Sequence, residues 1–292
     1  MGQEASNPVI ELRSVTTVSG GFEILRDVSV AFTEGVTTAV LGSAGSGKSA
    51  LLKTAAGLVV PDSGAVLFRG SSLASFSEDE ERYFRSRTSF VFQDAALWAN
   101  QTIFFNIALP LRIHKPWMGE SEVAERVRTT AERLGYVEGL AFRPADLSAG
   151  EQKLISIARA LVLDPELVFL DEPASGLDED AKERVQEVLD SLRDAGKSIL
   201  LVTNDMGWVH RIADRLVIVR DGRLAAAGPY DEVVASEVPE TAGLVARLRA
   251  RGARGMRSRG AEESAGTVVL SDPEPPETGK SAGGAAEGER GT

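Results

Sequence analysis

The 292-residue sequence contains no cysteine and only two histidines. Without cysteine the chain has no disulfide, thiolate zinc site, iron–sulfur cluster or cysteine nucleophile, and two histidines are too few for most histidine-rich metal sites. No run of about 18 apolar residues occurs, so the sequence predicts no transmembrane helix. The first ten residues lack a basic segment followed by an apolar one, which argues against a secretory signal.

Basic residues are also in short supply, with 32 lysines and arginines against 43 acidic residues and a formal net charge of −11. A general nucleic-acid binder would carry an excess of positive charge on one face. The composition therefore argues against nucleic acid as a partner. Hydrophobic residues make up 43% of the chain, which is enough for a sizeable core.

The composition changes sharply near Arg251. Residues 252–292 are rich in Gly, Ala, Ser, Glu and Pro and hold few large apolar side chains, so we expect a domain over 1–250 and a disordered tail over 251–292. A basic cluster runs from Arg247 to Arg259 across this boundary. It fits either contact with anionic lipid headgroups or the solvated end of a helix.

Short apolar segments alternate with amphipathic ones in the first 250 residues. Three segments are almost wholly apolar, as expected for parallel strands covered on both faces: 36–41, 167–170 and 199–202. Between them, apolar residues recur at helical spacing in 154–161 and 185–192. This alternation predicts an α/β fold with a ligand site beyond the carboxyl ends of its strands. Asp221-Gly222, between two apolar stretches, is typical of a hairpin turn.

The strongest motif directly follows the first apolar segment. It reads Gly42-Ser43-Ala44-Gly45-Ser46-Gly47-Lys48-Ser49, followed by Ala50, and satisfies G-x-x-x-x-G-K-[ST]. Glycines let successive backbone N–H groups point at one anion, and the helix that follows adds the positive end of its dipole. We predict that residues 42–50 bind a nucleoside triphosphate, with Lys48 on its β- and γ-phosphates and the Ser49 hydroxyl on Mg²⁺. A glycine-rich turn without a ligand is the weaker interpretation.

A pair of acids, Asp171-Glu172, ends the second apolar segment. Two adjacent carboxylates repel one another unless a cation lies near them, and Mg²⁺ supplies that charge. We predict that Asp171 holds the metal ion, directly or through water, and that Glu172 polarises the attacking water. In isolation the pair also fits the acidic start of a helix.

Over about residues 8–235 the sequence resembles the nucleotide-binding subunits of ABC transporters. The motif Leu147-Ser148-Ala149-Gly150-Glu151-Gln152 looks like the signature of that family, Gln93 looks like its Q-loop glutamine, and Ser175-Gly176-Leu177-Asp178 looks like its D-loop. Taken alone, Gln93 fits any polar strand end and Ser148 fits a serine-capped helix start.

The resemblance implies a P-loop NTPase core with a mostly parallel sheet, an antiparallel β subdomain and a helical subdomain inserted at about 94–163. It implies ATP and Mg²⁺ as ligands, Gln93 at the metal and the reacting water, and Asp178 at the nucleotide. Asn204 stands at the position of the family's catalytic switch residue.

Ser148, with the backbone of Ala149 and Gly150, would form a second helix N-terminus and therefore a second anion site. The resemblance implies a head-to-tail homodimer in which each ATP lies between Lys48 of one copy and Ser148 and Gly150 of the other. It also implies a separate integral membrane permease as partner and a peripheral location on the cytoplasmic face of the cell membrane. Residues 92–97 and 106–111 look most similar to ATPases of bacterial lipid-handling systems, including Mce-associated ones, which favours a lipid cargo.

An apolar patch follows Gln93. It consists of Trp98, Ile103, Phe104, Phe105 and Ile107. In the family this neighbourhood receives a coupling helix of the permease, and ordinary subdomain core is the competing interpretation.

Four positions depart from the family pattern. Ser19 stands where an aromatic residue usually stacks on adenine, with Phe22 nearby as a substitute. Ala149 replaces a glycine and Leu154 replaces an arginine. The fourth departure concerns catalysis, because Asn204 replaces a histidine.

An asparagine amide can donate a hydrogen bond to a phosphate, yet it neither titrates nor carries charge. This leaves two functions open: a transport ATPase, and a regulatory or scaffold subunit, similar to cell-division relatives, with weak ATP turnover. The retained Glu172 favours the ATPase.

Overall fold

The computed structural model describes residues 8–236 and 241–250. The expected tail over 251–292, and the arginines of the basic cluster beyond Arg249, lie outside these residues. None of the helices in the described ranges combines the length and apolar character that a membrane span requires.

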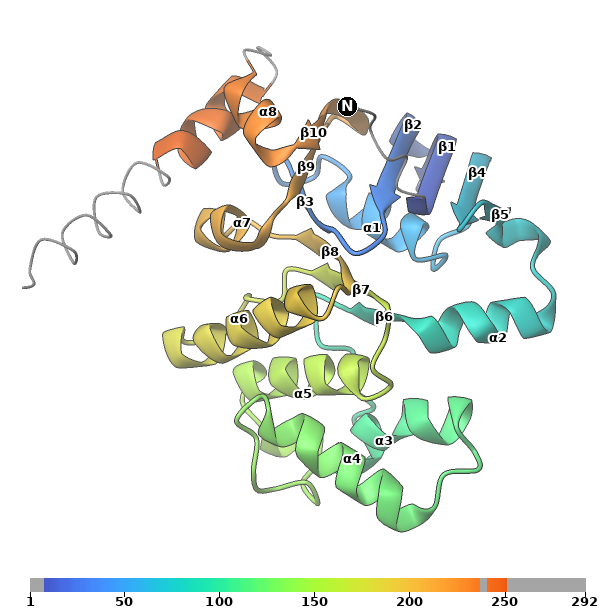
Figure 1. Cartoon of the computed structure of the whole chain (residues 1–292), viewed down its shortest axis with the longest axis vertical. Helices are drawn as coiled ribbons and strands as arrows, with labels where there is room; N and C mark the ends of the chain where they lie inside the picture. The colour runs from blue at the N-terminus through green and yellow to red at the C-terminus, as the bar shows by residue number, and fades with distance from the viewer. Residues whose placement is uncertain (1–7, 237–240, 251–292) are drawn as a thin grey trace, which may run out of the picture. The chain divides into compact units, whose positions relative to one another are not determined.

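A six-stranded sheet with the order β10-β9-β3-β8-β7-β6 forms the centre of the fold (Figure 1). Its strands are β3 (Thr37–Leu41), β6 (Thr88–Val91), β7 (Leu167–Asp171), β8 (Ser198–Val202), β9 (Arg215–Arg220) and β10 (Arg223–Pro229). All pairs are parallel except β9 with β10, which the turn at Asp221-Gly222 joins as a hairpin. The mostly parallel sheet, its apolar strands and the hairpin are confirmed.

Both faces of this sheet are covered, which explains why β3, β7 and β8 are buried at every residue. Along β7, Val168 and Leu170 pack in one cluster with α5 (Ala149–Leu161) and α6 (Glu179–Asp194). Leu167 and Phe169 belong to the opposite cluster, with α1 (Lys48–Ala55). The alternation follows from the two-residue period of a strand.

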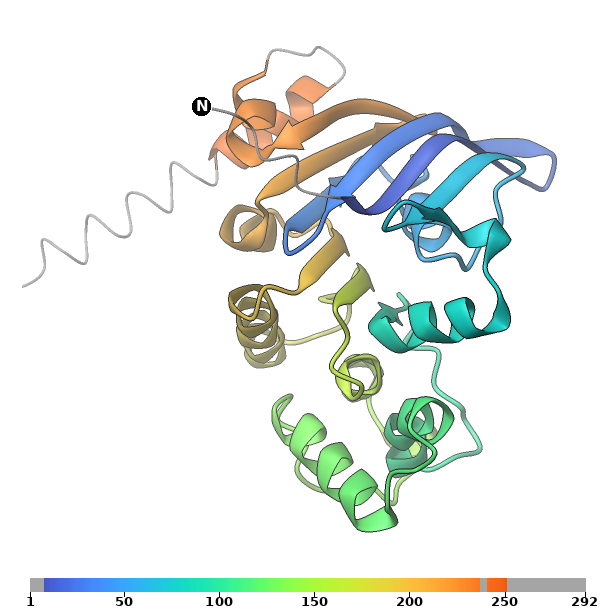
Figure 2. The same ribbon diagram turned by 45° about the vertical axis from the view of Figure 1, so that its right-hand side comes forward.

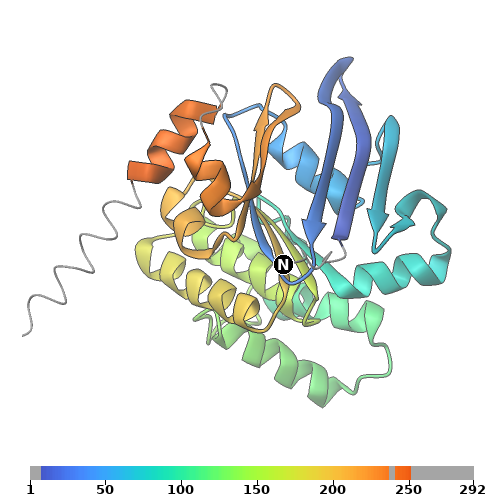
Figure 3. The ribbon, with the colours of Figure 1, turned by 45° about the horizontal axis from the view of Figure 1, so that its top comes forward.

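A second, antiparallel sheet with the order β2-β1-β4-β5 shares the cluster on the α1 side. Its strands are β1 (Pro8–Ser19), β2 (Phe22–Thr33), β4 (Ser63–Phe68) and β5 (Ser71–Ser72). The backbone N–H of Arg26 donates to the carbonyl of Gly222 at 2.8 Å, so the β9–β10 hairpin lies against β2 (Figure 3). The antiparallel part of the fold prediction is therefore confirmed.

Helices dominate between β5 and β7. They are α2 (Glu78–Arg87), α3 (Ile103–His114), α4 (Glu120–Glu132) and α5, with short 3₁₀ turns at Leu73–Ser75 and Pro144–Asp146. Helices α3 and α4 lie at the end remote from the antiparallel sheet (Figure 2). After β8 the chain adds α7 (Met206–Ile212) and α8 (Tyr230–Ala235).

The apolar patch predicted after Gln93 is divided by the fold. Ile103 and Ile107 are fully buried in the core of α3, α4 and α5, so for them the core interpretation is the right one. Trp98 is 52% exposed and its ring lies 6.2 Å from that of Phe105. The exposed part of the patch is therefore smaller than the sequence indicated, because helix α3 turns its isoleucines inward.

Candidate functional site

The register of the parallel strands brings the predicted motifs to one edge of the sheet. Val202 at the end of β8 pairs with Val40 on one side and with Asp171 on the other, and Val91 of β6 pairs with Leu170. The residues that follow these strand ends therefore leave the sheet side by side. They are the P-loop, Glu172, Asn204 and Gln93, which the sequence separates by up to 162 positions, 204 − 42.

The P-loop backbone is too closely packed at two points for any residue but glycine. A Cβ on Gly42, where φ is +155°, would lie 2.2 Å from the carbonyl oxygen of Val219. A Cβ on Gly47, where φ is +104°, would lie 2.9 Å from the carbonyl oxygen of Ile24. Strands β9 and β2 therefore fix the curvature of the loop.

Polar atoms inside the loop are arranged for an anion. The ammonium of Lys48 is buried and donates to the carbonyl oxygens of Gly42 and Ser43 at 3.0 and 2.8 Å. The hydroxyl of Ser46 is buried and has no hydrogen-bond partner among the described residues. A buried cation beside an unpartnered donor, at the N-terminus of α1, fits the phosphates of a nucleotide.

Two predicted metal ligands meet across 122 residues of sequence. The Ser49 hydroxyl donates to a carboxylate oxygen of Asp171, and the two oxygens are 2.9 Å apart. Neighbouring oxygens around an octahedral Mg²⁺ with 2.0–2.1 Å bonds lie about 2.9 Å apart, so the spacing fits this ion. Within the part of the chain that the structure describes, no group of three His, Asp or Glu side chains is arranged to hold a metal ion.

Glu172 lies at the same edge in a strained conformation. Its φ of +48° is unusual for a non-glycine residue, and its N–H donates to the carbonyl of Val202 at 2.9 Å. Its carboxylate accepts hydrogen bonds from the side-chain amide of Asn204 at 2.6 Å and from the Asn204 backbone N–H at 3.3 Å. Burial raises the pKa of Glu172, while the Asn204 N–H and the charge of Lys48 oppose the rise.

The signature serine caps a helix, as one reading of the sequence predicted. Ser148 precedes α5, and its hydroxyl accepts from the N–H of Glu151 at 3.2 Å and donates to the Glu151 carboxylate at 2.7 Å. The Ser148 hydroxyl and the Ser148 backbone N–H, at 2.8 Å, both donate to the Glu151 carboxylate and lower its pKa. A Cβ on Gly150 would lie 3.2 Å from the carbonyl of Gly176, so α5 begins in close contact with the predicted D-loop.

Asp178 also caps a helix, since its carboxylate accepts from the N–H of Ala181 at 2.7 Å at the start of α6. Its contact with nucleotide stays a prediction. Phe22, the proposed substitute for an adenine-stacking aromatic at Ser19, is 75% exposed and pairs with Ser19 across the β1–β2 hairpin.

The sequence interpretation missed two basic residues on α5. Lys153 donates to the carbonyls of Phe92 and Gln93 at 2.9 and 2.7 Å, and Arg159 donates to those of Ala95 and Ala96 at 2.9 and 2.8 Å. The sequence offered one indication of their role: each is a charged residue adjacent to the apolar, inward-facing positions of an amphipathic helix. It does not show which carbonyls, about 60 residues away, the side chain reaches.

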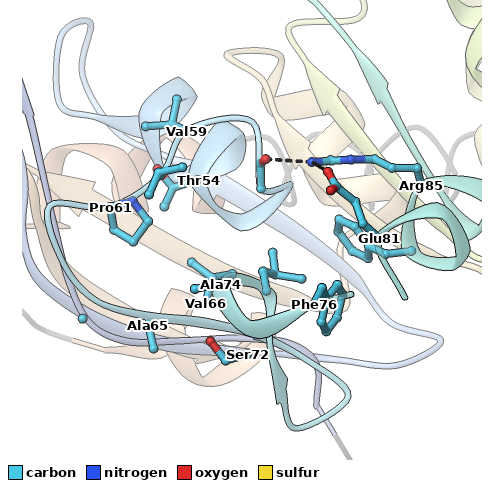
Figure 4. Close-up of a pocket in the computed structure, with 15 residues that line it drawn as sticks. Thr54, Val59, Pro61, Ala65, Val66, Ser72, Ala74, Phe76, Glu81 and Arg85 are labelled. Atoms are coloured by element: carbon cyan, nitrogen blue, oxygen red, sulfur yellow. Dashed lines mark hydrogen bonds and ion pairs between the residues drawn. The ribbon is translucent and has the colours of Figure 1, made fainter. Parts of the chain in front are cut away.

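A separate pocket of about 270 Å³ lies between the C-terminal end of α1, the antiparallel sheet and α2 (Figure 4). Leu73, Phe76 and Phe84 contribute apolar walls, and Arg85 lies at one side, where it pairs with Glu81. The pocket contains none of the predicted nucleotide-binding residues. It is therefore distinct from the site at the strand ends.

Comparison with known proteins agrees with this geometry. A family model described as ABC transporter matches residues 25–175. The chain belongs to this family. Among relatives of this ABC protein, the methionine import ATP-binding protein MetN of Brucella abortus (strain 2308) is 35% identical over 235 residues, which is 79% of this chain and 62% of MetN. The octopine permease ATP-binding protein P of Rhizobium radiobacter is 32% identical over 238 residues, or 78% and 90% of the two chains.

Two solved structures match the ABC fold of the chain. The dimeric post-hydrolysis state of the ATP-binding cassette MJ0796, bound to ADP and phosphate, has a TM-score of 0.71 at 27% identity and covers 75% of this chain and 98% of the cassette. CbiO1 from Clostridium perfringens, part of a transporter complex cbiONQ, has a TM-score of 0.66 at 25% identity, with 86% and 99% covered. The chain is thus an ABC cassette that matches about 62% of the length of MetN.

Proposed function

We propose that this chain binds and hydrolyses ATP as the motor subunit of an ABC transporter. The observation that carries the proposal is the shared edge where Lys48, the Ser49–Asp171 pair and the Asn204–Glu172 pair meet. These groups supply a phosphate cradle, two metal ligands and an oriented carboxylate in one place.

In the proposed reaction, Lys48 exchanges the carbonyls of Gly42 and Ser43 for phosphate oxygens of ATP. Ser49, Asp171 and Gln93 would hold Mg²⁺, which neutralises developing phosphate charge when bound. Glu172 accepts a hydrogen bond from the attacking water and aligns it with the γ-phosphate. Its raised pKa brings the carboxylate closer in basicity to the proton it must receive.

Asn204 serves two purposes in this proposal. Its side-chain amide holds one oxygen of the Glu172 carboxylate and its backbone N–H bonds the other at 3.3 Å, so the carboxylate is oriented and its remaining lone pairs can accept from the water. Because the amide is neutral, it adds less stabilisation to the γ-phosphate than a charged donor would. We expect hydrolysis to proceed, at a lower rate than with a histidine at this position.

Dimerisation would complete the site. The exposed N-terminus of α5 offers Ser148 and Gly150 to the ATP of a second copy, with Asp178 close to the contact. The dimeric state of the MJ0796 cassette supports this arrangement. ATP would then bind the closed dimer more tightly than ADP does, and this difference drives the motion.

A membrane permease encoded separately is the proposed partner, with the chain held peripherally on the cytoplasmic face of the membrane. Trp98 and Phe105 form the exposed part of the proposed docking site for its coupling helix. The names of the relatives, methionine import and octopine permease, favour a transport role and give the lipid cargo no support. Lipid contact by the arginine cluster also stays a prediction, and its Arg249 bonds the carbonyl of Val234.

Steady-state ATPase measurements on the full chain with its permease test the proposal, with Glu172→Gln as the matched control. We expect wild-type turnover at least about 100-fold above that of the variant. Equal turnover in the two proteins would favour the regulatory or scaffold alternative. A second assay follows ATP-dependent dimerisation of Glu172→Gln by size exclusion, with Ser148→Arg added to block the second anion site.

A further inference from the structure

Lys153 is the buried cation closest in sequence to the signature motif, five residues after Ser148 on α5. Its side chain is almost completely enclosed, with 3% of the residue exposed. The ammonium donates to the last carbonyl before the Q-loop, that of Phe92, and to the carbonyl of Gln93 itself. The signature helix is therefore bonded to the backbone of the proposed metal and water ligand.

A neutral side chain would meet the same packing need at a lower cost in desolvation, because both acceptors are uncharged carbonyls. A lysine differs from a neutral side chain at this position because it carries a positive charge. Burial lowers the pKa of Lys153, and the negative charges of Asp171, Asp94 and Glu172 oppose that change. What the geometry fixes is the ammonium's two bonds to the carbonyls of Phe92 and Gln93, at the strand edge that Asp171 and Glu172 share.

Two other positions in this region lack the cation that the family resemblance leads one to expect. Leu154 is buried in the apolar cluster of the helical segment, and Asn204 is neutral. Lys48 and Lys153 are buried cations near this edge, and their charges oppose the rise in the pKa of Glu172. Lys48 belongs to the P-loop, whereas Lys153 belongs to the helix that starts with the signature serine.

We propose that Lys153 is a positioning residue that couples the signature helix to the catalytic edge. It holds the Gln93 backbone in place and sets a fixed positive charge beside Asp171 and Glu172. Lys153 follows Ser148 by five positions, or about 7.5 Å along the helix, so a displacement of Ser148 by the partner's nucleotide moves the ammonium and Gln93 with it. This inference rests on the proposed ATP hydrolysis.

Arg159 provides a comparison for Lys153, because it is a second basic residue of α5 that bonds backbone carbonyls after Gln93. It bonds the carbonyls of Ala95 and Ala96 in the same loop, and burial lowers its pKa. Arg159 therefore tethers the same loop as Lys153, at the carbonyls two and three residues after Gln93. Loss of Arg159 measures the effect of a looser loop, and loss of Lys153 adds the effect of the missing charge.

The test compares Lys153→Met, Lys153→Gln and Lys153→Arg in the full chain with its permease. We expect Met and Gln to lower kcat by about 10- to 100-fold, and Arg to restore it to within about threefold of wild type. Affinity of the monomer for ATP, titrated in the Glu172→Gln background, should change by less than about threefold, since the P-loop is untouched. Lys182→Met on α6 serves as the control variant, because the half-buried Lys182 pairs with the exposed Glu179 and bonds no part of the Q-loop.

A second readout does not need hydrolysis. In the Glu172→Gln background, Lys153→Met should raise the ATP concentration for half-maximal dimerisation by about tenfold, because the signature helix is no longer anchored to the Q-loop. Lys153→Arg should leave that concentration near the value of the background protein. If Lys153→Met folds poorly, Lys153→Gln takes its place in the dimerisation assay.

Two results would overturn the proposal: turnover and dimerisation of Lys153→Gln within twofold of their reference proteins, or Lys153→Arg as impaired as Lys153→Met. Either outcome leaves ATP hydrolysis itself intact, provided that wild type still exceeds Glu172→Gln. If wild type does not exceed Glu172→Gln, the proposed function fails, and the dimerisation assay still decides the coupling by Lys153.

Discussion

The side-chain amide of Asn204 donates to the carboxylate of Glu172 at 2.6 Å, across 32 residues of sequence. One carboxylate oxygen is therefore already oriented before any substrate binds. A histidine at position 204 could make a similar bond with one ring nitrogen and could also carry charge. The asparagine thus retains the orienting contact and lacks the charge.

Replacing Asn204 by histidine is expected to raise kcat by about 5- to 10-fold, because a charge-assisted bond to the γ-phosphate is stronger than a neutral one. Asn204→Ala should lower kcat by about tenfold, since the Glu172 carboxylate loses its side-chain donor. Steady-state phosphate release from the complex measures both. Wild-type turnover in Asn204→Ala would show that the bond has no part in catalysis.

As the pH is lowered, the rate of hydrolysis should begin to fall at a higher pH than it would if the catalytic glutamate had an unshifted pKa. Burial raises the pKa of Glu172, and only its ionised form can act as a base. Rate profiles across pH, taken at saturating ATP, check this expectation. A profile whose acidic limb lies at the position of an exposed glutamate would contradict it.

The same shift predicts a pH-dependent effect on stability. A carboxyl whose pKa is higher in the folded than in the unfolded state contributes stability below its unfolded pKa and loses that contribution as the pH rises through its folded pKa. Glu172→Gln should therefore raise Tm more at about pH 8 than at about pH 4. Thermal unfolding without nucleotide measures this, with the exposed Glu187→Gln on α6 as control. A Tm gain independent of pH would argue against the shift.

Nucleotide affinity should depend on Gly42 far more than on Gly45. Gly42→Ala places a methyl group 2.2 Å from the Val219 carbonyl, so the loop must move and ATP affinity should drop by at least about tenfold. A Cβ on Gly45 meets nothing within 4 Å, and Gly45→Ala should cost only backbone strain of about 1 kcal/mol. Titration with a fluorescent ATP analogue compares the two, and similar affinities would refute the packing argument.

Thr54→Val should stabilise the chain by about 1 kcal/mol, because the buried Thr54 hydroxyl beside the 270 Å³ pocket has no hydrogen-bond partner among the described residues. The matched control is Thr130→Val on α4, where the hydroxyl donates to the carbonyl of Arg126 at 2.7 Å and its loss should destabilise. Urea unfolding measures both variants. A destabilised Thr54→Val would reveal a partner for the hydroxyl.

The local sequence determined which segments of this protein form buried strands and which loop carries the residues for phosphate binding. Uniformly apolar segments predicted β3, β7 and β8, because strands covered on both faces need apolar side chains on both faces. The P-loop could also be predicted, since glycines, Lys48 and Ser49 act within one turn between a strand and a helix. Local sequence does not show why Gly42 and Gly47 must be glycine, because the carbonyls that would block a Cβ belong to Val219 in β9 and Ile24 in β2.

Tertiary structure alone decided the contacts between elements. Register in the parallel sheet placed Asp171 beside Ser49 and Asn204 beside Glu172, and the packing of α5 against β6 carried Lys153 to Gln93. The direction in which α3 faces its core decided that Ile103 and Ile107 are buried. Such contacts depend on which faces of distant elements meet, and a local pattern carries no information about the partner that a buried donor will find.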